Sequence, residues 1–138
     1  MNTPTYFTLY ELLYSQTALY SKIPNHPTWK QVENLNRLAI TILDPIRKAF
    51  GKPIKVSSGF RSTLLNKAVG GVSNSQHLKG LAADLQVADL KALKRAIIES
   101  GVPYDQLIEE SKGGSKWLHI SCAEYGITPR KQVLTITL

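Results

Sequence analysis

The stretch SQHLKGLAAD, residues 75–84, decides how this chain folds. Its histidine and its aspartate stand seven residues apart, with Gly80 between them. In a straight strand such residues point to opposite faces, whereas a chain reversal near Gly80 brings both side chains to one point. A single helix would also align them, but Gly80 and the β-compatible residues that follow Ala83 favour the turn. Because imidazole and carboxylate are both good zinc ligands, the stretch predicts part of a metal site at His77 and Asp84.

A second stretch, WLHIS at residues 117–121, places a histidine inside an apolar run. Alternate residues of a strand point to opposite faces, so Leu118 and Ile120 define a core face and His119 points away from it. A third metal ligand fits that position. Two histidines and one aspartate, with a fourth position open to water, are the arrangement expected of catalytic rather than structural zinc.

The composition is that of an ordinary globular protein, with 138 residues and 43% hydrophobic residues. This length fits one domain, which we expect to span residues 1–138. The single cysteine, Cys122, excludes an internal disulfide and a zinc site built from several cysteines. Any metal site must therefore depend mainly on His, Asp and Glu.

The formal net charge of +7 draws the protein towards polyanions such as nucleic acid, anionic membranes or anionic cell-wall polymers. Binding to single-stranded nucleic acid needs a basic groove with interleaved aromatic residues. The four tyrosines between residues 6 and 20 stand near few basic residues, so we expect no nucleic-acid partner. We also expect a monomer.

No secretory signal is visible at residues 1–10, which lack a basic region followed by an apolar run. No stretch approaches the roughly 18–20 apolar residues that a membrane helix needs, so we expect no membrane insertion. The expectation is synthesis in the cytoplasm, with release by another device if the protein acts outside the cell.

The apolar patterns predict helices first and strands later. We expect helices at residues 8–21, 28–50 and 88–100, a helical turn at 64–69, and strands at 53–57, 81–87, 104–110, 116–122 and 132–138. Pro45 lies inside the second helix and is expected to kink or divide it. This order indicates an α+β domain in which N-terminal helices pack on a small antiparallel sheet that carries the metal site.

A third motif, SGFRS, occurs at residues 58–62, before the two stretches described above. Together the motifs resemble the D-alanyl-D-alanine carboxypeptidase-like zinc peptidases, the peptidase M15 family, which includes VanY-type enzymes and phage endolysin peptidases. That family carries Ser-Gly-(Tyr/Phe)-Arg-Ser, then Ser-x-His-x-x-Gly-x-Ala-x-Asp, then a strand with Trp-x-His. All three occur here in that order. The resemblance continues upstream through residues 11–29 and 34–54 and so covers nearly the whole chain.

The resemblance implies that Zn²⁺ is held by His77, Asp84 and His119. It also implies that Arg61 holds a substrate carboxylate or carbonyl oxygen near the metal, a task that suits the planar donor fork of a guanidinium. Three further residues are expected at the substrate pocket: Ser75, Gln76 and Trp117. The alternative for Ser75 is to steady the loop, and the alternative for Trp117 is a place in the core.

The family also supplies a glutamate before the final histidine as the general base. Glu110 fits best, because the hairpin after it brings it beside the strand of His119. Some relatives have this glutamate only three residues before the histidine, whereas Glu110 lies nine before it, so Glu109 remains the alternative.

The function that the resemblance implies is zinc-dependent hydrolysis of peptide bonds in bacterial peptidoglycan stem peptides, at the cell wall. The sequence leaves the bond open among D,D-carboxypeptidase, D,D-dipeptidase and L,D-endopeptidase activity, and it leaves a phage or a bacterial origin open. The alternative is a non-catalytic zinc-binding module of the same fold that binds the cell wall. These two hypotheses differ in whether Glu110 or Glu109 reaches the water on the metal.

Overall fold

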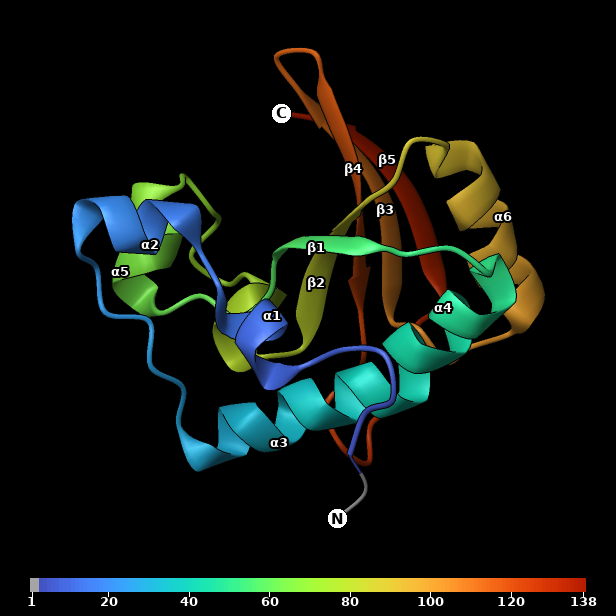
Figure 1. The fold of residues 1–138 in the computed structure, drawn as a ribbon, viewed down its shortest axis with the longest axis horizontal. Coiled ribbons are helices and arrows are strands. Elements are labelled where there is room, and N and C mark those ends of the chain that lie inside the picture. Colours follow the sequence, from blue (N-terminus) through green and yellow to red (C-terminus); the bar gives the residue numbers. More distant parts are fainter. Residues whose placement is uncertain (1–2) are drawn as a thin grey trace.

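A five-stranded sheet with the strand order β1-β2-β4-β3-β5 forms the centre of the molecule (Figure 1). The computed structural model describes residues 3–138, so the first two residues of the predicted domain lie outside the described part. The strands are β1 (Lys55–Ser58), β2 (Ala82–Gln86), β3 (Gln106–Lys112), β4 (Ser115–Ser121) and β5 (Gln132–Thr137). The expected α+β class is confirmed.

Six α-helices accompany this sheet in residues 3–138. They are α1 (Leu9–Leu13), α2 (Gln16–Ser21), α3 (Trp29–Leu38), α4 (Asp44–Phe50), α5 (Thr63–Ala68) and α6 (Leu90–Ser100). The helix expected at residues 8–21 is two helices, because Tyr14 and Ser15 are extended and Ser15 caps the second one. None of the helices in residues 3–138 has the length and apolar character needed to cross a membrane.

The long helix expected at residues 28–50 is divided near Pro45, as predicted. A π-helical turn, η1 (Ala39–Leu43), joins α3 to α4, and Pro45 stands in the first turn of α4. Proline has no N–H to donate to the preceding turn, so a local change of helix type accommodates it. The chain nevertheless continues as one helical rod to Gly51, whose left-handed backbone ends it.

The hydrophobic core lies between one face of the sheet and the helices α3, α4 and α6. Leu118 and Ile120 of β4 are fully buried there, as the strand alternation predicts. We call this side the helix face. The other side, which carries Asp84, Glu110 and His119, is called the polar face. It positions the candidate site.

The sheet is mixed rather than wholly antiparallel. Strand β5 pairs parallel to β3, with Gln106 opposite Gln132, whereas the other pairs are antiparallel. Both sides of β4 are already occupied by β2 and β3, so the returning chain adds to the free edge of β3, where its direction is parallel. The alternating pattern of residues 132–138 predicts a strand correctly but carries no information on its direction.

Candidate metal centre

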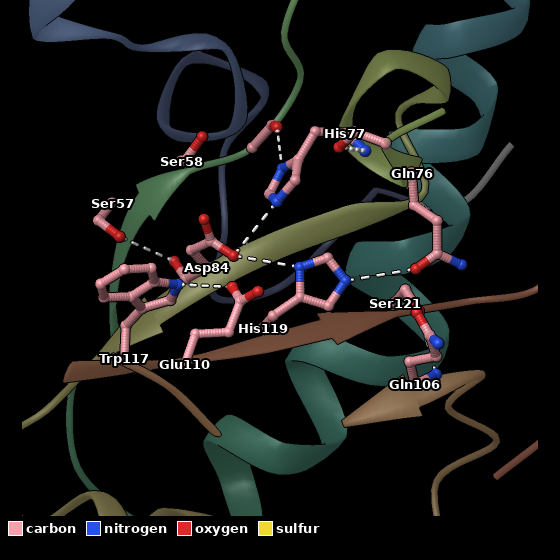
Figure 2. Close-up of polar contacts among 12 residues, drawn as sticks. Ser57, Ser58, Gln76, His77, Asp84, Gln106, Glu110, Trp117, His119 and Ser121 are labelled. Atoms are coloured by element: carbon pink, nitrogen blue, oxygen red, sulfur yellow. Dashed lines mark hydrogen bonds and ion pairs between the residues drawn. The ribbon is translucent and has the colours of Figure 1, made fainter. Parts of the chain in front are cut away.

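Two histidines and one aspartate meet on the polar face (Figure 2). Asp84 of β2 lies directly opposite His119 of β4, and His77 approaches from the 3₁₀ turn η2 (Gln76–Lys79). His77 Nε2 and His119 Nδ1 each lie 3.2 Å from Asp84 Oδ1. One ligand atom from each residue lies within 4.8 Å of the others, and all three side chains are buried. The structure thus brings together the three residues that the sequence singled out.

The chain reverses at Gly80, as the spacing of His77 and Asp84 predicts. Gly80 has a left-handed backbone, with φ of 73°, and ends η2. A β-carbon at this position would lie only 2.6 Å from the carbonyl oxygen of Gln31. Glycine is therefore required at this position both for the turn and for its close packing on α3. The turn begins at Ser75, whose hydroxyl accepts a hydrogen bond from the backbone N–H of His77.

Each imidazole has a partner on its outer nitrogen, away from Asp84. His77 Nδ1 donates to the carbonyl oxygen of Gly59 at 2.7 Å, and His119 Nε2 donates to Gln76 Oε1 at 3.3 Å. A neutral imidazole that donates from one nitrogen carries a lone pair on the other. His77 Nε2 and His119 Nδ1 therefore direct lone pairs towards Asp84. Metal-binding histidines commonly have this outer partner.

The cluster consequently holds three acceptor atoms that face one another. Burial raises the pKa of Asp84, but when His77 and His119 are protonated on both nitrogens, their positive charge and hydrogen bonds outweigh burial and hold this pKa well below its ordinary value. The carboxylate therefore stays ionised, as a metal ligand must. Facing acceptors repel one another unless a positive charge lies between them. The residues present thus fit a single divalent cation with two nitrogen donors and one oxygen donor.

Arg61 lies beside the cluster and contacts the outer oxygen of Asp84. Its Nη2 is 3.3 Å from Asp84 Oδ2, its Nη1 donates to Asn66 Oδ1 at 3.1 Å, and its Nε donates to Ser58 Oγ at 3.0 Å. Burial lowers the pKa of Arg61, while the negative charges of Asp84 and Glu110 oppose that change. The guanidinium remains charged. Its expected contact with substrate stays a prediction.

The two candidate general bases lie on opposite faces of the sheet. Glu109 accepts a hydrogen bond from Lys94 Nζ of α6 at 2.7 Å, so it belongs to the helix face. Glu110 lies on the polar face, where Trp117 Nε1 donates to its Oε1 at 2.8 Å (Figure 2). Strand alternation explains the difference, since neighbouring residues of β3 point in opposite directions.

The residues expected at the substrate pocket already have protein partners. Ser75 caps η2, Gln76 bridges His119 and Asp105, and Trp117 binds Glu110. These contacts make them part of the frame around the cluster. Their contact with substrate stays a prediction.

The sequence reasoning missed two contributors to the frame. Gly59 supplies the carbonyl oxygen for His77, and a β-carbon on it would lie 2.2 Å from the carbonyl oxygen of Leu12. Its place in the SGFRS motif was a usable signal for a close backbone approach. Asp105 lies far along the chain from η2 and shows no motif, so nothing in the local sequence indicates its contact with Gln76.

An α+β domain that gathers two imidazoles and a carboxylate in this way defines a protein built to hold one metal ion on a sheet face. The sequence model of the Peptidase M15 family matches residues 5–121, and the chain belongs to this family. The resemblance seen in the three motifs is therefore confirmed.

One relative is the zinc D-Ala-D-Ala carboxypeptidase of Streptomyces albus G, 57% identical over 44 residues. That match covers 31% of this chain and 17% of the relative, so the chain spans less than a fifth of the relative's length in this comparison.

Proposed function

We propose that the protein is a zinc-dependent metallopeptidase that hydrolyses peptide bonds in bacterial peptidoglycan stem peptides. The convergence of His77, Asp84 and His119 on one point carries this proposal. Membership of the Peptidase M15 family supports the reaction type, and the name of the Streptomyces relative supports zinc and D-Ala-D-Ala peptides. The expected site of action is the cell wall.

His77 Nε2, His119 Nδ1 and an oxygen of Asp84 would hold the metal. Zinc bound there would supply a Lewis acid for the scissile carbonyl and would lower the pKa of a bound water. Asp84 is held in place by Arg61 and by its position in β2, opposite β4. A ligand fixed in this way loses little freedom when the ion binds.

Glu110 is assigned as the general base. The hydrogen bond from Trp117 fixes one oxygen of its carboxylate, and the side chain lies on the same face as His119. Its role is to accept a proton from the attacking water and to pass it to the leaving amine. Glu109 is not assigned this role, because it pairs with Lys94 on the helix face.

Arg61 is assigned to the substrate. Its guanidinium offers donors to a carboxylate or to the oxygen on which negative charge develops. Ser75, Gln76 and Trp117 surround the cluster and complete the proposed pocket. The net charge of +7 suits an anionic cell wall.

The test is to incubate zinc-loaded protein with defined wall peptides and to identify the products by mass spectrometry. The first substrate is a stem peptide that ends in D-Ala-D-Ala, followed by a cross-linked peptide and one with an intact L,D bond. Release of a single D-alanine, of the dipeptide or of internal fragments distinguishes the three activities.

A Glu110→Gln variant provides the matched control. It keeps the shape of the side chain and should bind zinc as the wild type does, but turnover should fall by about 10²–10⁴-fold. Zinc uptake without any product from the wild type would overturn the proposed hydrolysis and leave the non-catalytic, wall-binding module. Full activity in the variant would exclude Glu110 as the base.

A further inference from the structure

A chain of hydrogen bonds leads outward from His119 to the C-terminal part of the molecule. Gln76 accepts from His119 Nε2 with its Oε1 and donates from its Nε2 to Asp105 Oδ2 at 3.0 Å. Arg130 then binds Asp105 through Nη2 at 2.7 Å and through its backbone N–H at 2.9 Å. Figure 2 shows Gln76 at the side of His119 that points away from Asp84.

The ion pair of Asp105 with Arg130 fixes the direction of the hydrogen bonds that lead to His119. Hydrogen bonds from Arg130 lower the pKa of Asp105, so its carboxylate is ionised near neutral pH and accepts hydrogen bonds without donating any. The Gln76 amide must therefore turn its NH₂ group towards Asp105 and its oxygen towards His119. An oxygen at that position requires a proton on His119 Nε2. The remaining nitrogen, Nδ1, then carries the lone pair that faces Asp84.

The outer end of this chain of hydrogen bonds lies beyond the region that matches the family. The family match ends at residue 121, whereas Arg130 and the strand β5 follow it. The same segment also holds the backbone of Asp105, because Gln132 N–H donates to the Asp105 carbonyl oxygen at 2.9 Å. Asp105 is buried and has its own backbone N–H bonded to Ser121. The acceptor for Gln76 is thus fixed in space.

His77 offers a comparison within the same site. Its outer nitrogen donates to a backbone carbonyl oxygen, that of Gly59, which can only accept. No side chain needs to be oriented to fix its tautomer. His119 instead depends on an amide, which can present either a donor or an acceptor, so the tautomer of His119 depends on what orients that amide.

We infer that Gln76, Asp105 and Arg130 form a positioning relay that fixes the tautomer and ring orientation of His119 for metal binding. This inference rests on the proposed metal site. It assigns to Gln76 a role through His119, and to Arg130 a role in the site although its side chain is 56% exposed.

The first readout is the tautomer of His119 in metal-free protein at pH 8.5, above the ordinary histidine pKa of about 6.5. Long-range ¹⁵N–¹H NMR spectra of the imidazole distinguish the two tautomers. The wild type should show the Nε2–H form of His119. Gln76→Leu should show a mixture of forms, because the acceptor is removed.

The second readout is zinc affinity, measured by competition with a chromophoric chelator. Gln76→Leu and Asp105→Asn should each weaken zinc binding by about 10–100-fold, the usual effect of losing an outer partner of a metal-binding histidine. Glu124→Gln is the control, since Glu124 lines the same surface cavity as Gln76 and Asp105 but bonds to Lys79. It should bind zinc as the wild type does.

A double variant separates positioning from a structural role. Gln76→Glu alone places two carboxylates side by side and should weaken zinc binding. Combining it with Asp105→Asn reverses this hydrogen bond: the new amide at position 105 donates to the carboxylate at position 76, which still accepts from His119 Nε2. The double variant should therefore recover most of the zinc affinity and the Nε2–H form of His119. Thermal melts of the metal-free variants confirm that each is folded.

The relay is overturned if Gln76→Leu is folded and leaves both the tautomer and the zinc affinity within about twofold of wild type. Failure of the double variant to improve on Gln76→Glu would also overturn it. Neither result depends on peptide cleavage, so loss of the relay and loss of the proposed peptidase activity are distinguishable. The tautomer measurement also applies if the wild type takes up no zinc.

Discussion

The two faces of strand β4 carry different kinds of residue. On the helix face, Leu118 and Ile120 are fully buried in an apolar core. On the polar face, His119 is also buried, but its two ring nitrogens lie beside Asp84 and Gln76. Burial of a polar group is costly unless it is hydrogen-bonded. The comparison teaches that one face supplies stability and the other carries the candidate metal centre, within a single strand of seven residues.

The largest expected effect is a loss of zinc affinity when His119 is removed from the polar face. His119→Ala removes a proposed metal ligand, so zinc affinity should fall by more than the roughly 10–100-fold that losing an outer partner costs. The fold should survive, because the core lies on the other face. Isothermal titration with zinc and a thermal melt of the metal-free protein check the two parts.

His26→Ala is the matched control, since His26 is exposed and lies outside the cluster. It should bind zinc as the wild type does. An unfolded His119→Ala variant would contradict the separation of the two faces.

The next largest effect is a loss of stability when the neighbouring residue, Leu118 on the helix face, is truncated. Leu118→Ala leaves a cavity among fully buried side chains and should lower the free energy of unfolding by about 2–5 kcal/mol. Zinc affinity of the folded fraction should stay within a few-fold of wild type. Urea denaturation of metal-free protein measures the first quantity, and chelator competition well below the midpoint measures the second. A loss under about 1 kcal/mol would show that this face is less tightly packed than described.

The smallest expected effect is a pH-dependent change in melting temperature when the ion pair of Asp105 with Arg130 is removed. Hydrogen bonds from Arg130 lower the pKa of Asp105 in the folded state. A lowered pKa contributes stability above the unfolded value of about 3.9, and that contribution is lost as the pH falls through the folded value. The melting temperature of metal-free wild type should therefore exceed that of Asp105→Asn at pH 7. The difference should shrink below about pH 4. A difference that grows on acidification would contradict the assigned cause.

Much of the site was predictable because its signals are local. The turn at Gly80 and the alternation of β4 both follow from backbone geometry, and they place His77, Asp84 and His119 correctly. The same alternation separates Glu110 from Glu109 once the neighbouring helix is known. The helix division at Pro45 was likewise predicted by the missing N–H of proline.

The parts that the sequence did not reveal depend on contacts between distant segments. The parallel direction of β5 follows from the edge of the sheet that it joins, that of β3, and not from its own residues. The contact of Gln76 with Asp105 joins η2 to the start of β3, and Arg130 reaches the same carboxylate from beyond β4. Such contacts need the assembled sheet. The expected substrate contact of Gln76 stays a prediction, and its contact with His119, which the structure shows, was not foreseen from the motif.

X-ray absorption at the zinc edge of zinc-loaded protein tests the central claim most directly. We expect one zinc ion per chain, bound by two imidazoles and by oxygen donors, with distances of about 2.0–2.2 Å. The His119→Ala variant should lose one imidazole from this signal. A zinc ion bound through sulfur at about 2.3 Å, or no zinc retained at one equivalent, would contradict the account.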